Sequence, residues 1–247
     1  MGVLRGRAGR MAGGHRQKIN HPLHWDFRLQ AEIFFFAGSY GTVKTNDGCP
    51  ERGSMMKQTI AGAVLAGGQS RRFGRPKAFA LHEGAPFFTW SVAALRSVAD
   101  ELYIVSHPSL IDEFRRQTDI PVLLDVERCR GCGPLAGLYT VMEQSRADWV
   151  FVLPCDMPYM RREVAERLAS YIDPTFDAIV PLHGGRPEPL VALYHRRLRS
   201  VIAELLDAGE RRMISLIDGA RVRWVDAEQL AADSDVWRNV NTEEEYR

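Results

Sequence analysis

The 247 residues carry a formal net charge of +1, with 45% hydrophobic and 26% charged residues, which is ordinary globular composition. This charge gives no broad basic field for nucleic acid or a membrane surface, and no run of about 18 apolar residues marks a membrane span. The 4 cysteines are too few and too scattered for a disulfide framework, so a reducing cytoplasm is the expected compartment.

Residues 1–55 are expected to lie outside the folded domain. Basic residues outnumber acidic ones there, and no period of 2 or 3.6 is sustained. The apolar stretch Ala31–Gly38 is too short for the core of a signal peptide. We interpret the segment as a disordered leader, or as sequence upstream of a start at Met55 or Met56, with a transit peptide as the alternative. The folded domain is then residues 56–247.

From Lys57 onward, strand-like and helix-like segments alternate along the chain. In chain order we expect a strand at 59–65, a helix at 86–100, a strand at 101–106, a helix at 109–117, a strand at 121–125, a helix at 133–144, a strand at 148–156, a helix at 161–172, strands at 177–182 and 188–194, a helix at 198–208 and a strand at 221–225. Pro86 is expected in the first turn of its helix, and Ser109 is expected to cap the next one. This alternation predicts an α/β fold with a mainly parallel sheet.

The segment after the first predicted strand is rich in glycine and in positive charge. It contains Gly67, Gly68, Arg71, Arg72, Gly74, Arg75 and Lys77. The spacing matches neither a Walker A loop nor the dinucleotide-binding glycine motif. Glycines let backbone N–H groups approach a phosphate closely, and Arg and Lys supply the opposite charge. The segment therefore predicts a polyphosphate-binding loop, with a solvated basic turn as the alternative.

Two aspartates follow strands whose carboxyl ends are expected to meet at the same edge of the sheet, where ligands bind in such folds. Asp156, between Pro154 and Pro158, is suited to hold a divalent cation together with substrate phosphates. Its alternative role is an N-cap for the following helix. Asp125 is interpreted as a nucleotide contact, with a second metal ligand or a turn residue as alternatives.

No pattern in the sequence indicates covalent catalysis. Cys129 and Cys132 form a C-x-x-C pair, but the second pair that a zinc site would need is missing, so we interpret them as an incidental loop pair. The 7 histidines do not cluster, and no nucleophile elbow is present. The residues favour positioning and charge neutralisation, which is how phosphoryl and nucleotidyl groups are transferred.

Six stretches in this order resemble the molybdenum cofactor guanylyltransferases. They are LAGGQSRRFGRPKA, GPLAGL (Gly133–Leu138), LPCDMPYM (Leu153–Met160), RPEPLVALY (Arg186–Tyr194), AGERRM (Ala208–Met213) and NVNTEEEY (Asn239–Tyr246). The resemblance covers about Lys57 to Arg247. It implies a single three-layer αβα domain with a mainly parallel, Rossmann-like nucleotidyltransferase sheet.

The resemblance also implies a reaction, in which GMP passes from GTP to the molybdopterin cofactor and pyrophosphate is released. Its substrates would be GTP and molybdopterin, its cofactor Mg²⁺, and its further partners molybdoenzymes or cofactor-insertion proteins in transient contact. Carried over by position, the nucleotide-binding residues implied by the resemblance are Leu65, Ala66, Gly67, Gly68, Lys77, Asp125 and Asp156. Asp156 would also bind the metal, and the catalytic residues would be Lys77, Asp156 and Arg71. Asn239 and Asn241 match a motif associated with the pterin.

The sequence departs from the family pattern at three places. Pro76 stands where many relatives have Asp, Glu243 where a proline is usual, and Ser106 where some have Asn, so no contact is assigned to Ser106.

Two other readings remain open. One is a molybdopterin cytidylyltransferase, which uses CTP, or a related NTP transferase, and the other is a protein that binds a nucleotide without turning it over.

Overall fold

In this computed structural model the described residues are 58–68, 70 and 73–242. The interpretation of residues 1–55 as a leader therefore falls outside them, as do Arg71 and Arg72 of the basic loop.

A single large sheet runs through the described residues, with strand order β10-β7-β9-β6-β1-β4-β5 and β8 paired to β7. Its strands are β1 (Ile60–Ala66), β4 (Glu101–Ser106), β5 (Val122–Leu124), β6 (Trp149–Pro154), β7 (Ala178–His183), β8 (Arg186–Pro187), β9 (Ala192–His195) and β10 (Val222–Asp226). A separate hairpin joins β2 (Leu81–His82) to β3 (Ala85–Pro86). Within the large sheet, all neighbouring pairs are parallel except those that involve β8 or β9.

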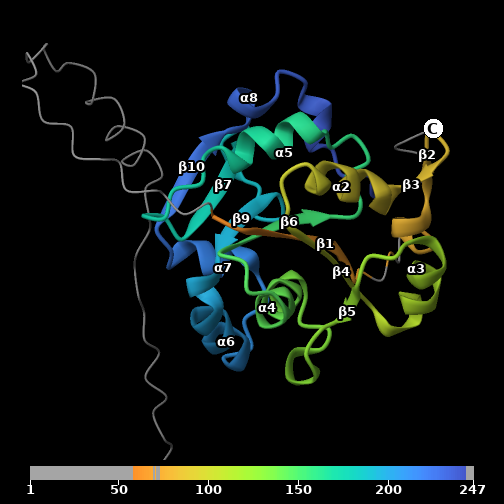
Figure 1. The fold of residues 1–247 in the computed structure, drawn as a ribbon, viewed down its shortest axis with the longest axis horizontal. Helices are drawn as coiled ribbons and strands as arrows, with labels where there is room; N and C mark the ends of the chain where they lie inside the picture. Colours follow the sequence, from red (N-terminus) through yellow and green to blue (C-terminus); the bar gives the residue numbers. More distant parts are fainter. Residues whose placement is uncertain (1–57, 69, 71–72, 243–247) are drawn as a thin grey trace, which may run out of the picture. The chain divides into compact units, whose positions relative to one another are not determined.

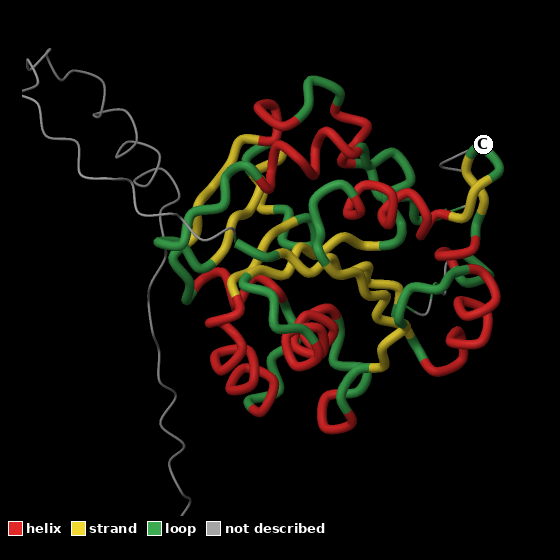
Figure 2. Tube along the Cα trace, viewed as in Figure 1, coloured by secondary structure: helices red, strands yellow, loops and turns green. Residues whose placement is uncertain are grey.

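Helices cover both faces of this sheet (Figures 1 and 2). They are α2 (Phe87–Arg96), α3 (Ile111–Gln117), α4 (Pro134–Gln144), α5 (Arg162–Ala169), α6 (Arg199–Asp207), α7 (Met213–Asp218) and α8 (Ala227–Leu230). Short 3₁₀ turns lie at Lys77–Phe79, Pro108–Leu110, Glu127–Cys129, Arg196–Leu198 and Ser234–Trp237. None of the described helices combines the length and apolar character that crossing a bilayer requires.

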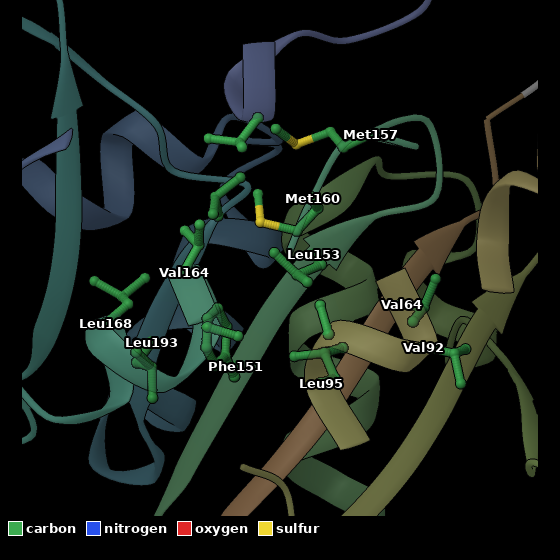
Figure 3. Packing of buried hydrophobic residues seen from close by; sticks show 14 of the residues in the cluster. Val64, Val92, Leu95, Phe151, Leu153, Met157, Met160, Val164, Leu168 and Leu193 are labelled. Atoms are coloured by element: carbon green, nitrogen blue, oxygen red, sulfur yellow. The ribbon is translucent and has the colours of Figure 1, made fainter. Parts of the chain in front are cut away.

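Alternation along the central strands sorts the core into two layers. On β6, Phe151 and Leu153 pack into one cluster, with residues of α2, α5 and α8 (Figure 3). Val150 and Val152 pack into the other, with residues of α4, α6 and α7. Because successive side chains on a strand point to opposite faces, a strand that is apolar throughout is buried on both sides. The predicted three-layer αβα architecture follows from this pattern.

The order of the strands creates a crevice beside β1. The chain proceeds outward from β1 to β4 and β5, and then returns to the opposite side of β1 as β6. Where the connections that follow two adjacent parallel strands lead in opposite directions, an opening forms at the carboxyl ends of the strands, and α/β proteins bind ligands there. The loops that follow β1 and β6 both begin at this opening, since Leu65 pairs with Pro154 at the strand ends.

Three of the predicted helix boundaries are wrong. The helix predicted at 86–100 ends at Arg96, because Asp100 accepts the Ile60 N–H at 2.9 Å and its own N–H bonds back to Ile60. Ser109 does not cap a helix; it lies in a 3₁₀ turn that the His107 side chain caps, and α3 begins at Ile111.

The third error concerns the segment 161–172, where α5 spans only Arg162–Ala169. The residues beyond it form tight turns, in which Tyr171 N–H donates to Leu168 and Ile172 N–H donates to Ala169.

Candidate active site

A cavity of about 760 Å³ lies at the carboxyl ends of β1, β4, β5 and β6. It brings together the described members of the predicted site: Leu65, Ala66, Gly67, Gly68, Lys77, Asp125 and Asp156, with Asn239 and Asn241. The prediction that these segments meet at one place is confirmed by this lining. Arg71, the remaining predicted residue, lies outside the described part of the chain.

Lys77 and Asp156 form an ion pair in the cavity. The ammonium of Lys77 donates to Asp156 Oδ2 at 2.7 Å, and the two side chains are 15% and 21% exposed. Lys77 begins a 3₁₀ turn after the basic loop, and Asp156 lies two residues beyond the end of β6. The partial burial strengthens their attraction relative to a pair in open solvent. The pair thus links the two loops that flank the crevice.

The C-terminal segment closes over this pair. Lys77 Nζ also donates to Val240 O and to Asn241 Oδ1, each at 3.1 Å, and Val240 N–H donates to Asp156 O at 2.9 Å. Val240 is fully buried beside Phe73 and Phe87. All three donor positions of the ammonium are therefore used within the protein, and the last described residues form one wall of the cavity.

Hydrogen bonds to Ser70 shape the described part of the basic loop. Lys77 N–H donates to Ser70 Oγ at 3.1 Å, and Phe73 N–H donates to Ser70 O at 2.9 Å. Ser70 and Gly74 have φ values of 46° and 73°, in the left-handed region where glycine is favoured. These contacts hold the described end of the loop so that Lys77 lines the cavity.

Asp125 is a half-buried carboxylate on the other side of the cavity. Its Oδ2 accepts the Gly131 N–H at 3.0 Å. Burial raises the pKa of Asp125 above its ordinary value, while the Gly131 N–H opposes that rise. Gly131 has a φ of 74°, which places its N–H toward the carboxylate in a turn that other residues seldom adopt.

Helix α4 packs unusually close to β1. A Cβ at Gly137 would lie 2.8 Å from Leu65 Cδ2, a distance that real side chains do not reach. Pro134 opens the helix, and Gly133 before it has a φ of 77°. The stretch GPLAGL is thus explained by helix initiation and by close approach to the strand that carries the basic loop.

Sequence reasoning missed several cavity residues, among them Ser70, His107, Cys155 and Leu190. His107 could have been found from its place directly after a strand at the binding edge. The sequence around Leu190 did not indicate a cavity residue, because the apolar pattern of 188–194 predicted an ordinary strand. Burial, followed by the charge of Asp156, raises the pKa of Cys155 to about 12, so this thiol stays protonated at neutral pH and is a poor nucleophile.

The described residues hold no group of three or more His, Cys, Asp or Glu side chains arranged to bind a metal. Cys132, the second cysteine of the C-x-x-C pair, is a free thiol. A cation in the cavity would therefore depend on Asp156 and on oxygens brought by a ligand. Mg²⁺ is commonly bound in this way, through one or two carboxylates and substrate phosphates.

Comparison with known proteins identifies the family of this chain and the fold that it shares with solved structures. The MobA-like NTP transferase domain model matches residues 62–223. A probable molybdenum cofactor guanylyltransferase of Geobacillus sp. (strain WCH70) is 55% identical over 187 residues, which are 76% of this chain and 96% of the relative.

Solved structures of lower identity share the fold. Molybdopterin-guanine dinucleotide biosynthesis protein A from Archaeoglobus fulgidus superposes with a TM-score of 0.66 at 22% identity, over 75% of this chain and 94% of that one. A Mycobacterium tuberculosis protein in complex with manganese has a TM-score of 0.54 at 18% identity, over 69% and 88% of the two chains. The predicted α/β nucleotidyltransferase fold is confirmed.

The Asp125→Asn variant tests the burial of that carboxylate. The amide keeps an acceptor for Gly131 but removes a half-buried charge, so we expect a larger free energy of unfolding than wild type at neutral pH. Because the folded-state pKa is raised, the difference should shrink as pH falls through that pKa and vanish below 3.8, the ordinary value. Urea unfolding over a series from about pH 7 to about pH 3.5 measures it.

Asp148→Asn is the control of opposite sign. The N–H and hydroxyl of Thr59 both donate to Asp148 Oδ2 at 2.9 Å and hold the pKa of Asp148 below its ordinary value. This variant should lose stability at neutral pH, and the loss should fade as pH falls below 3.8 and through the folded-state pKa. Equal shifts of both variants in one direction would contradict the assignment.

Proposed function

We propose that this chain, which belongs to the MobA-like NTP transferase family as a molybdenum cofactor guanylyltransferase, transfers GMP from GTP to molybdopterin and releases pyrophosphate. The observation that carries the proposal is the Lys77–Asp156 pair at the crevice beside β1. A cation and a carboxylate at the same point of a cavity suit a substrate that arrives as a metal–polyphosphate complex.

The nucleotide is proposed to lie on the side of the cavity formed by β1, β4 and β5. The backbone of Leu65 to Gly68 would approach its phosphates, since Gly67 and Gly68 are exposed and present no side chain to obstruct them. Asp125, at the far side, would accept a hydrogen bond from the nucleoside. Its raised pKa and half-buried position are features of groups that await a ligand.

Asp156 is the residue proposed to hold a divalent cation, Mg²⁺ in our proposal, together with phosphate oxygens of the nucleotide. Such an ion would neutralise charge on the transferred and leaving phosphates. The manganese complex of the Mycobacterium tuberculosis protein supports a divalent ion in this fold.

The transfer step needs no covalent enzyme intermediate. The terminal phosphate of the pterin acceptor would attack the α-phosphorus of GTP in line, forming one P–O bond as the bond to the bridging oxygen of the leaving pyrophosphate breaks. Lys77 would stabilise the negative charge that develops on the pyrophosphate, and Arg71 is proposed to assist it.

Substrate binding would exchange the partners of Lys77 and Asp156. Before binding, each neutralises the other at 2.7 Å, which avoids an unpaired charge in a partly buried site. When a metal-bound triphosphate enters, the ammonium can move to the phosphates and the carboxylate to the cation. Both charges then remain compensated, so the exchange leaves no buried charge unpaired.

The product is a cofactor that must reach other proteins. We propose transient contact with molybdoenzymes or cofactor-insertion proteins, and a cytoplasmic location. Cys132 and Cys155 are free thiols, which fits a reducing compartment.

Pyrophosphate release tests the function directly. With Mg²⁺ and purified molybdopterin, the full chain should release pyrophosphate with GTP far faster than with CTP. Faster release with CTP would make the chain a cytidylyltransferase, and tight GTP binding without release would make it a nucleotide-binding protein. Omission of molybdopterin is the control, and it should abolish release.

Asp156→Asn tests the proposed metal ligand. The variant keeps the shape of the side chain but loses its charge, so turnover should fall by about 100-fold to 1000-fold while GTP affinity falls much less. Asp112→Asn is the control, because Asp112 lies on α3 and is 85% exposed. Turnover of the Asp156 variant within a few-fold of wild type would contradict the proposed role.

A further inference from the structure

A second group of side chains lies at the same edge of the sheet as the cavity. β7 runs parallel to β6 in the sheet, since β9 between them is antiparallel to both, so His183 at the end of β7 lies on the edge that carries Asp156. Glu188 follows β8, and Trp237 ends a 3₁₀ turn. We call these three residues the His183–Glu188–Trp237 cluster.

The cluster adjoins the cavity through two short connections. Leu190, two residues after Glu188, lines the cavity, and so does Asn239, two residues after Trp237. In the sheet, β9 and β7 lie on one side of β6, whereas β1, β4 and β5 lie on the other. The cluster is thus on the side of Asp156 opposite to the proposed nucleotide position.

The backbone around Glu188 is firmly held. Glu188 N–H donates to Pro181 O at 2.9 Å, and Glu188 O accepts the Val191 N–H at 3.0 Å. The hydroxyl of Tyr194, a fully buried residue, donates to Pro189 O at 2.7 Å. These bonds fix a turn whose first residue is Glu188, so the position of its side chain is set before any ligand arrives.

The carboxylate of Glu188 itself is left with little to bind. Its side chain is only 28% exposed, and the ion-pair contact that it makes within the described residues, with His183 Nδ1 at 3.9 Å, is beyond hydrogen-bond distance. Among the described residues, no hydrogen-bond donor reaches this carboxylate. Burial raises the pKa of Glu188, as expected where a carboxylate loses water without gaining donors. Such a group is costly to keep unless a ligand supplies the donors.

His183 offers a flat surface next to this carboxylate. Its ring stacks on Trp237 with centroids 5.8 Å apart and an angle of 27° between the planes. Trp237 is 5% exposed, whereas the His183 side chain is 40% exposed. The tryptophan therefore supports the imidazole from within, and the imidazole faces outward, where a planar heterocycle could stack on it.

We infer that Glu188 binds the 2-amino-4-oxopyrimidine edge of the pterin acceptor, with His183 beside the ring. This edge presents two adjacent N–H donors, and a carboxylate accepts both at once. The inference rests on the proposed function, which supplies a pterin acceptor. It makes Glu188 a specificity-determining residue for the second substrate, separated from the nucleotide side of the cavity by Lys77 and Asp156.

Guanine carries the same pair of donors, so the test must separate the two substrates. In Glu188→Gln the side chain keeps its size, but one acceptor oxygen becomes a donor that opposes the ligand. We expect the KM for molybdopterin to rise by about tenfold to a hundredfold, with kcat and the KM for GTP changed less than about twofold. Pyrophosphate release under varied concentrations of each substrate gives all three values.

Glu166→Gln is the matched control, because Glu166 lies on α5 and its 43% exposed side chain pairs with Arg162 on the surface. An unchanged KM for molybdopterin in Glu188→Gln overturns the inference. A raised KM for GTP in its place assigns the carboxylate to guanine, which also overturns it. A general loss of thermal stability with a fall in kcat alone would show a structural role and contradict the inference as well.

Equilibrium binding of molybdopterin without GTP separates this inference from the proposed function. If the wild-type chain releases no pyrophosphate, the proposed function fails, yet Glu188→Gln must still weaken molybdopterin binding by about tenfold or more for the inference to hold. Equal affinity of the wild type and Glu188→Gln for molybdopterin would overturn the inference. Thermal unfolding of both proteins confirms that each is folded under the conditions of the assay.

Discussion

The ion pair between Lys77 and Asp156 is the interaction on which the site depends. The two residues are separated by 79 positions in the sequence, and they meet because β1 and β6 pair in parallel at the centre of the sheet. The same ammonium holds Val240 and Asn241, so the C-terminal segment is anchored by the group that is proposed to act on phosphates. The Lys77 ammonium thus connects the loop after β1, the loop after β6 and the C-terminal segment.

The sheet makes this meeting possible through its burial on both faces. Apolar residues along β1 and β6 pack alternately into the two helical layers, which fixes the register of the strands. The register in turn fixes where the loop after each strand begins. Gly137 then allows α4 to lie against Leu65. In the loops at the carboxyl edge, Ser70 and Gly131 adopt positive φ values, as Glu83 does in the β2–β3 hairpin.

Much of this could be predicted from the sequence, because the signals were local. Apolar runs that end in glycine or aspartate located the strands and, with them, the convergence of Lys77, Asp125 and Asp156. The orientation of β9 was not evident from its residues. It is antiparallel because a short hairpin rather than a helix connects it to β7, and a parallel crossover needs a longer link.

The remaining features depend on contacts between residues far apart in the chain. The end of α2 at Arg96 is set by Asp100 bonding to Ile60, and the closure of the cavity by Val240 reaching a lysine 163 positions away. That no described donor reaches the Glu188 carboxylate within hydrogen-bond distance is visible only in three dimensions, since its sequence context resembles an ordinary strand. Local propensity carries no information on such long-range contacts.

If Lys77 and Asp156 exchange partners when the nucleotide binds, a crystal structure of the chain with Mg²⁺ and a non-hydrolysable GTP analogue will show the exchange. We expect Lys77 Nζ within hydrogen-bond distance of a phosphate oxygen and the Asp156 carboxylate on the metal, with the 2.7 Å contact between them lost. A bound nucleotide with that contact intact and the metal held elsewhere would rule the exchange out.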